Sequence, residues 1–139
     1  MQQKTQKLKA IIEKNQNGFY SIYIPEIAGL FGSGETEREA KESLNEAIEM
    51  ALEHITETGD IGDYAILQNK YTIEYIYDLS GFFKTFDFFD TSALAKHIGI
   101  NASLLRRYKS GLTKASPSQK MKIANGIYGV AKRLSVAKF

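Results

Sequence analysis

Apolar and polar residues near the N-terminus follow a pattern that predicts a β-hairpin. The runs 8–13 (LKAIIE) and 19–24 (FYSIYI) favour strands, and Asn-Gly at 17–18 lies between them. Asn-Gly between two such runs is typical of a tight hairpin turn, because both residues tolerate the backbone conformation that the turn needs. Pro25 ends the second strand because it lacks a backbone N–H. The glycine-rich segment 29–34 leaves room for a short third strand.

Apolar residues at steps of three and four predict a helix over residues 36–58. Thr36 and Glu39 have the spacing of a capping box, in which a hydroxyl and a carboxylate accept hydrogen bonds from free backbone N–H groups. The apolar face consists of Ala40, Leu44, Ala47, Ile48, Ala51, Leu52 and Ile55. The opposite face carries Glu39, Glu42, Glu46, Glu49, Glu53 and Glu57. This acidic row is either a solvated surface or a docking surface for a basic protein.

Residues 59–90 begin with a polar, glycine-containing segment that is typical of a linker and continue with an aromatic-rich stretch. Tyr and Ile occupy every second position of 71–77 and predict a strand there. Nine of the 16 aromatic residues lie between positions 64 and 89. They either fill a core and pack between two modules, or form a subunit interface. The phenylalanines at 82, 83, 86 and 89 predict a short helix that packs onto the following residues.

The last part of the chain shows the pattern of two short helices, a turn between them and a longer final helix. Ala95 is a small residue where the two helices would cross, and Gly99 lies where the turn needs a positive φ angle. Asn101 is placed to cap a helix over 102–109, which Gly111 would end. Ser116-Pro117 predicts the start of the final helix. Its apolar positions Ile123, Ile127, Val130 (or Ala131) and Leu134 recur at helical spacing.

Charge divides the chain into two parts of opposite sign. The net charge of the 139 residues is +2, but residues 1–90 carry 8 Lys/Arg and all 16 Asp/Glu, whereas residues 91–139 carry 10 Lys/Arg and no acid. This division predicts two modules with different partners, a polyanion being the partner of the basic one. The 43% hydrophobic and 24% charged residues exclude wholesale disorder, and the length allows one domain or two small ones.

Several classes of protein are excluded by composition. No run approaches the 18 apolar residues of a membrane-spanning helix, so we expect no membrane partner. The basic N-terminus lacks the apolar stretch of a secretion signal, which favours a cytoplasmic location. The absence of cysteine excludes disulfides, thiolate metal sites and a cysteine nucleophile.

A set of short motifs within residues 7–58 resembles the N-terminal domain of HicB-family antitoxins. The motifs are, in order, Pro25-Glu-Ile-Ala-Gly29, Gly34-Glu-Thr36, Glu39-Ala40 and Glu46-Ala47-Ile48. The resemblance implies a partial ribonuclease-H-like fold with a three-stranded antiparallel sheet and one helix packed across it. It also implies a small basic RNA-cleaving toxin, HicA-like, as the partner. On the acidic row, the expected toxin-binding residues are Glu39, Glu42, Glu46, Glu49 and Glu53.

Residues 91–124 resemble a Cro/C1-type (XRE-like) helix-turn-helix domain, and the resemblance implies binding to operator double-stranded DNA. The residues that carry it are Leu94-Ala95, Gly99-Ile100, Leu105, Tyr108, Ser110-Gly111 and Lys122-Ile123-Ala124. Beyond Ala124 the chain departs from the pattern, because Asn125, Gly126 and Gly129 weaken the expected helix.

Geometry assigns roles to the basic residues of this segment. With Leu105 and Tyr108 buried, the expected outward residues of the recognition helix are Asn101, Ser103, Arg106 and Arg107. The two arginines are the best candidates for reading bases, since a guanidinium can span guanine O6 and N7. Lys96, Lys109 and Lys114 are better placed for phosphates. A generic RNA-binding patch, or charges that are merely solvated, are the other interpretations.

No arrangement of residues predicts an active site. The resemblance to ribonuclease H raises a nuclease hypothesis, which requires carboxylates around two metal ions. Glu13, however, is the only acid in the first strand pair, and His54 and His97 belong to different modules. We therefore expect no enzymatic activity, no metal and no cofactor.

Together these patterns predict an α+β protein. Residues 1–60 would form a toxin-binding module with a small antiparallel sheet and one packed helix. Residues 61–79 would form a linker with an extra strand, and residues 80–139 an all-α DNA-binding module. The expected function is antitoxin and autorepressor, acting as a dimer or tetramer. The alternatives are a stand-alone repressor, whose first module senses a ligand or dimerises, and a degenerate nuclease.

Overall fold

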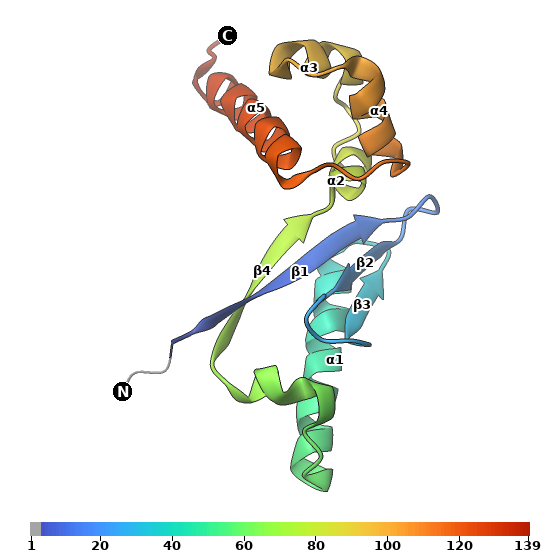
Figure 1. The fold of residues 1–139 in the computed structure, drawn as a ribbon, viewed down its shortest axis with the longest axis vertical. Helices are drawn as coiled ribbons and strands as arrows, with labels where there is room; N and C mark the ends of the chain where they lie inside the picture. Colours follow the sequence, from blue (N-terminus) through green and yellow to red (C-terminus); the bar gives the residue numbers. More distant parts are fainter. Residues whose placement is uncertain (1–3) are drawn as a thin grey trace. The chain divides into compact units, whose positions relative to one another are not determined.

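The computed structural model describes residues 4–139, which divide into two compact units (Figure 1). The first unit ends at Gly81 and the second spans Phe82–Phe139. The elements up to the boundary are β1 (Gln6–Lys14), β2 (Tyr20–Tyr23), β3 (Phe31–Gly34), α1 (Glu37–Thr58), the 3-10 helix η1 (Gly62–Gln68) and β4 (Tyr71–Tyr77). Those that follow are α2 (Leu79–Thr85), which contains the boundary, α3 (Thr91–Ile98), α4 (Ala102–Ser110) and α5 (Pro117–Val136).

The sheet of the first unit is mixed, with the strand order β3-β2-β1-β4. β1 pairs with β2 and β2 with β3 in antiparallel fashion, whereas β1 and β4 are parallel. The hairpin, the short third strand and the strand at 71–77 are confirmed, but the expectation of a three-stranded, purely antiparallel sheet is wrong. The chain crosses the sheet in α1 before it returns as β4, and such a crossover allows the returning strand to run parallel to β1.

One face of the sheet packs against α1. β1 buries every second residue on this face, namely Leu8, Ala10 and Ile12, and α1 buries Ala40, Leu44, Ile48, Ala51 and Ile55. These are core positions of the predicted apolar face, so the helix at 36–58 is confirmed. Thr36 Oγ1 accepts a hydrogen bond from Glu39 N–H at 3.1 Å, and Glu39 Oε2 accepts one from Glu35 N–H at 2.9 Å. The capping box therefore forms, with the carboxylate bound one residue before Thr36.

The segment expected to be a linker is largely structured. η1 follows α1 after three residues, and its Leu67 is buried in the core of the first unit. Gly59 ends α1 with a positive φ of 71°, which glycine adopts without steric penalty. Residues 62–77 therefore form part of the first unit rather than a solvated connection.

The second unit is a small helical assembly whose core is made by α3, α4 and α5. Its buried residues include Leu94, Ala95, Leu105, Tyr108 and Ile123. The final helix continues through Gly126 and Gly129 to Val136, although the sequence indicated a weak helix there. α5 approaches α3 closely at Gly126, because a Cβ atom at this position would lie 2.5 Å from Ile98 Cγ1. Glycine at 126 therefore permits the packing of the two helices.

The phenylalanines at the start of the second unit contact one another. The ring centroids of Phe82 and Phe86 are 4.9 Å apart, and those of Phe82 and Phe83 are 5.2 Å apart. Phe89 stacks with Phe82 at 6.2 Å, whereas Phe88 is 77% exposed. The predicted short helix is confirmed as α2, but it ends before Phe86.

Candidate nucleic-acid interface and acidic helix surface

Helices α3 and α4 are joined by a turn of three residues, 99–101, as the sequence predicted. Gly99 has a φ of 89°, in the left-handed region that favours glycine. Asn101 Oδ1 accepts hydrogen bonds from Ser103 N–H at 2.8 Å and Leu104 N–H at 3.2 Å, which caps α4. Gly111 ends α4 with a φ of 81°. The predicted caps at both ends of α4 are therefore confirmed.

The outward residues of α4 are exposed, and Arg106 is held in place by two hydroxyl groups. Its Nη1 donates a hydrogen bond to Ser92 Oγ of α3 at 3.0 Å, and its Nη2 donates one to Ser103 Oγ at 3.3 Å. Arg107 is also exposed and makes no side-chain hydrogen bond or ion pair to another residue in the described part of the chain. Arg106 is thus oriented before any ligand binds, whereas Arg107 is free to adapt.

Lysines surround these two helices. Lys96 on α3 and Lys114 after α4 are exposed, and Lys109 on α4 is half-buried. The second unit has 11 Lys/Arg and 2 Asp/Glu, a net charge of +9. A surface of this charge attracts the phosphate backbone of nucleic acids. The arrangement can therefore bind a polyanion and present the exposed Arg106 and Arg107 to it.

Two contacts that support this surface were not predicted from the sequence. Ser92 binds Arg106, as described above, and Lys122 Nζ of α5 donates a hydrogen bond to the carbonyl of Gly99 at 3.0 Å. Lys122 therefore satisfies a carbonyl at the C-terminal end of α3, where a cation is favourable. A serine in the first turn of α3 and a lysine 23 residues after a glycine give no local signal of either contact.

The acidic row lies on the solvent side of α1, opposite the core. All five residues expected to bind a toxin, Glu39, Glu42, Glu46, Glu49 and Glu53, are exposed. Two of them have partners within the chain: Glu39 belongs to the cap, and Glu42 forms an ion pair with Arg38 at 3.1 Å. Glu46, Glu49 and Glu53 form no ion pair with any residue of 4–139.

This unpaired charge is locally unfavourable. Glu49 and Glu53 are four residues apart and repel each other, and the last turn of α1 contains no basic residue to balance Glu57. The first unit has 7 Lys/Arg and 14 Asp/Glu, a net charge of −7. Binding of a cationic partner to this surface would therefore be electrostatically favourable.

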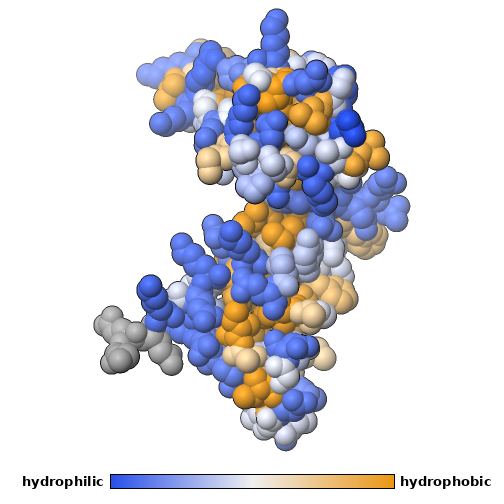
Figure 2. Space-filling view, in the orientation of Figure 1, coloured by the Kyte–Doolittle hydropathy of each residue, from blue (hydrophilic) through white to orange (hydrophobic). Residues whose placement is uncertain are grey.

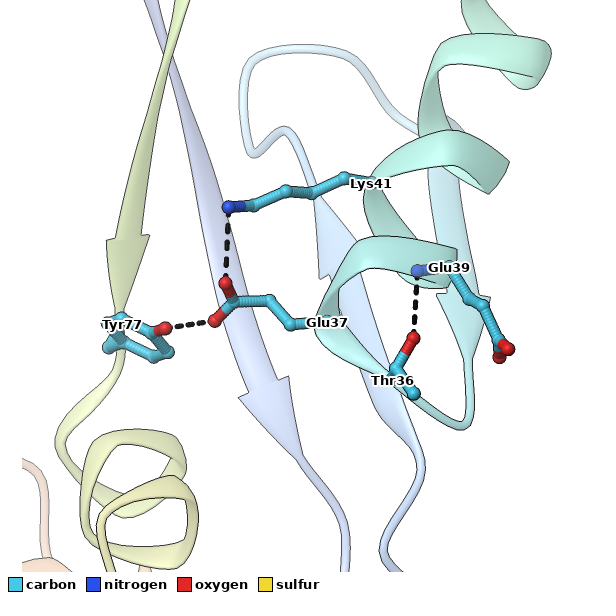
Figure 3. A network of polar contacts seen from close by, with 5 residues as sticks. All are labelled: Thr36, Glu37, Glu39, Lys41 and Tyr77. Atoms are coloured by element: carbon cyan, nitrogen blue, oxygen red, sulfur yellow. Dashed lines mark hydrogen bonds and ion pairs between the residues drawn. The ribbon is translucent and has the colours of Figure 1, made fainter.

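A polar network joins the start of α1 to β4 (Figure 3). Tyr77 Oη donates a hydrogen bond to Glu37 Oε1, and Lys41 Nζ forms an ion pair with Glu37 Oε2 at 3.2 Å. The same Lys41 Nζ lies 4.5 Å from the centroid of the Tyr75 ring, a cation–π contact. The network connects β4, an edge strand of the sheet, to the first turns of α1.

Alkaline pH is expected to destabilise the first unit through Tyr77. Burial, followed by the hydrogen bond to Glu37 and its charge, raises the pKa of Tyr77 above the ordinary value of 10.0. The unfolded chain loses this proton above about pH 10 while the folded chain keeps it, so the free energy of unfolding falls as the pH rises beyond 10. Tyr77→Phe should reduce this fall, measured by urea unfolding at pH 8 and pH 11. An equal fall in wild type and Tyr77→Phe would contradict the assignment, and Tyr128→Phe, at an exposed ring, is the matched control.

The groups considered for catalysis come from three different elements, β1, α1 and α3. His54 is exposed on α1 and His97 on α3, and Glu13 lies beside Tyr23, whose pKa is raised by burial and by the charge of Glu13. Within residues 4–139, no group of three or more His, Asp or Glu is close enough to hold a metal ion. The helices of this same range are also too short or too polar to cross a membrane.

The molecule is thus an α+β unit with an acidic helix surface, followed by a helical unit with a basic α3–turn–α4 surface. The family model of HicB-like antitoxins of bacterial toxin–antitoxin systems matches residues 8–102. The chain belongs to this HicB-like antitoxin family. A curated relative, a UPF0150 protein of Synechocystis sp., is 47% identical over 47 residues, which are 34% of this chain and 65% of the relative. The match therefore spans slightly less than two thirds of that relative, and no solved structure matches the chain.

Proposed function

We propose that this chain is the antitoxin of a cytoplasmic, type II HicAB-like toxin–antitoxin pair. Its first unit binds and masks a small basic RNA-cleaving toxin, and its second unit represses the operon through a helix-turn-helix. The observation that carries the proposal is membership of the HicB-like antitoxin family over residues 8–102. The opposite net charges of the two units, −7 and +9, support it independently, because they suit two partners of opposite charge.

Neutralisation in this proposal needs no chemistry from the antitoxin. The unpaired glutamates of α1, among them Glu46, Glu49 and Glu53, attract the basic toxin and orient it during the encounter. Docking then covers the surface with which the toxin cleaves RNA. Removal of α1 charge should therefore slow association and reduce its dependence on salt.

Repression in this proposal uses the α3–turn–α4 segment on double-stranded DNA. α4 enters the major groove with its N-terminal end toward the base edges, and Lys96, Lys109 and Lys114 contact phosphates. Two copies of the chain bind a palindromic operator, because a two-fold protein matches two symmetric half-sites. Toxin bound to the first units changes operator affinity by changing the assembly.

Co-purification tests the proposal most directly. The chain is tagged, expressed together with the genes that flank its own, and the mass of every co-eluting protein is measured. A small basic partner that is toxic when expressed alone is the expected result. Elution without a partner, together with binding to its own promoter, would instead support a stand-alone repressor. Metal-dependent RNA cleavage by the pure chain, lost in Glu13→Gln, would support a nuclease.

Arg106→Ala should weaken operator binding by about 1–3 kcal/mol and relax the preference for one base pair. The reason is that Ser92 and Ser103 hold the guanidinium of Arg106 in one orientation at the surface of α4. Binding is measured by mobility shift on operator and on random DNA, with Arg133→Ala in the last turn of α5 as the matched control. An equal loss on both DNAs would show that Arg106 contacts phosphate only.

A further inference from the structure

The strand β4 forms one edge of the sheet in the first unit (Figure 1). All seven residues of β4, Tyr71–Tyr77, are in register with β1. On its other side β4 pairs with no strand of the described chain. An edge of this length presents a row of backbone groups to which another strand can add.

Hydrogen bonds at both ends of β4 show which backbone groups face outward. Lys70 O accepts a bond from Gln6 N–H at 2.9 Å, and Asp78 N–H donates one to Ile12 O at 3.2 Å. Backbone groups of successive residues point to opposite sides of a strand, so the even-numbered residues face β1. The N–H and C=O groups of Tyr71, Ile73 and Tyr75 therefore point to the open edge. They form no hydrogen bond with any other residue that the structure describes.

The side chains of this edge offer little protection against strand addition. Proteins usually shield an edge with proline, lysine, a bulge or a covering segment. β4 contains no proline and no basic residue, and its one charge is the exposed Glu74. On the face toward α1, Tyr71, Ile73 and Tyr75 are only half-buried. Figure 2 shows hydrophobic side chains at the surface of the first unit.

We infer that an extended segment of a basic partner protein adds to the β4 edge as a fifth strand. This inference rests on the proposed function, in which that partner is the toxin. On the α1 side, the added segment places apolar residues against Tyr71, Ile73 and Tyr75. On the other side, it places a Lys or Arg opposite Glu74, where opposite charges in a cross-strand pair are favourable.

Charge argues against a second copy of this chain as the added strand. Two copies of β4 that pair antiparallel over their full length would place Glu74 directly opposite Glu74, and like charges in a cross-strand pair are destabilising. A shift by two residues avoids this contact but leaves residues at the end of each strand unpaired. The net charge of −7 on each first unit adds repulsion between two copies and attraction to a basic partner.

Amide hydrogen exchange by NMR tests the inference, with the full chain alone and in the presence of the product of the adjoining gene. The amides of Tyr71, Ile73 and Tyr75 should exchange rapidly in the free chain and become protected in the complex. The amides of residues 72, 74 and 76 should be protected in both, since they bind β1. A partner that docks on α1 alone would not produce this alternation.

Two variants complete the test by titration of the same gene product. Ile73→Pro removes an outward N–H without touching the β1 ladder and should weaken binding about tenfold, whereas Ile73→Val should have little effect. If Ile73→Pro does not fold, Glu74→Lys should weaken binding more than Glu26→Lys, an equal charge change at an exposed turn.

Each remaining outcome decides against the inference in a distinguishable way. Binding without alternate protection would overturn strand addition and leave the proposed function intact. Absence of any binding would overturn both. Protection of the same amides in the chain alone, with a dimeric mass that Ile73→Pro abolishes, would show that a second copy occupies the edge.

Discussion

Gly32→Ala is expected to unfold the first unit or to reduce its free energy of unfolding by about 3 kcal/mol or more. Gly32 lies in β3 directly beneath α1, and a Cβ atom there would lie 2.7 Å from Leu44 Cα and would also clash with Ala40 O and Leu44 N. These are backbone atoms, so no side-chain rotation can relieve the clash. Hydrogen exchange of the β1, β2 and α1 amides during urea unfolding measures the effect on this unit.

Gly129→Ala is the matched control for this substitution. It makes the same chemical change at a helical position of α5 with nothing within 4 Å of the added carbon. Alanine has a higher helix propensity than glycine, so the second unit should gain about 0.5–1 kcal/mol. Equal stability changes for Gly32→Ala and Gly129→Ala would show that β3 and α1 are not in close contact.

The structural roles of Gly32 and Gly126 could not be predicted from the sequence. In the sequence, Gly32 belongs to a glycine-rich turn, and Gly126 marks a weak point in the last helix. In the structure, each allows a close approach between elements, of β3 to α1 and of α5 to Ile98. Such a requirement depends on how a neighbouring element packs, 8 to 12 residues away for Gly32 and 28 residues away for Gly126. Local propensity contains no information about it.

Helices that begin with a clear capping residue were predicted correctly from the sequence. Thr36 and Asn101 cap their helices with the expected side-chain hydrogen bonds, and Ser116, expected at the start of the final helix, also caps it. These signals are local, since the capping oxygen binds an N–H two or three residues later. The pairing of β4 with β1, by contrast, joins residues more than 60 positions apart. The alternation of Tyr and Ile predicts the strand but neither its neighbour nor its direction.

For the candidate binding surfaces, too, the features within one helix could be predicted from the sequence and those between elements could not. The acidic row and the basic residues of α4 were predicted from spacing, because each surface lies on a single helix. The bonds of Arg106 to Ser92 and of Lys122 to Gly99 join different helices and could not be predicted. The edge of β4 also requires the strand order, and a sequence gives no strand order. The residues of each surface can therefore be predicted from the sequence, whereas the contacts that orient their side chains can be identified only from the fold.

The triple variant Glu46→Gln, Glu49→Gln and Glu53→Gln should bind the basic partner about a hundredfold more weakly at low salt. These glutamates are exposed and unpaired, so their charge is available to a cationic surface. The same substitutions should raise the stability of the first unit by about 0.5–1 kcal/mol, because they remove like-charge neighbours along α1. Titration of the adjoining gene product at two salt concentrations, and urea unfolding of the chain alone, measure the two effects.

The expected loss of binding and the expected gain in stability together distinguish a binding surface from a helix face that has only a structural role. A solvated helix face would show the gain in stability and no loss of binding. A helix that needs these carboxylates for folding would lose stability and binding together.

The matched control is the triple variant Glu26→Gln, Glu35→Gln and Asp87→Asn, which removes the same net charge at exposed positions away from the middle of α1. Because long-range attraction depends on net charge and docking depends on position, the control should lose much less affinity than the α1 variant. Equal losses in the two variants would show that the partner senses only the total charge of the chain, and that α1 is not the docking surface.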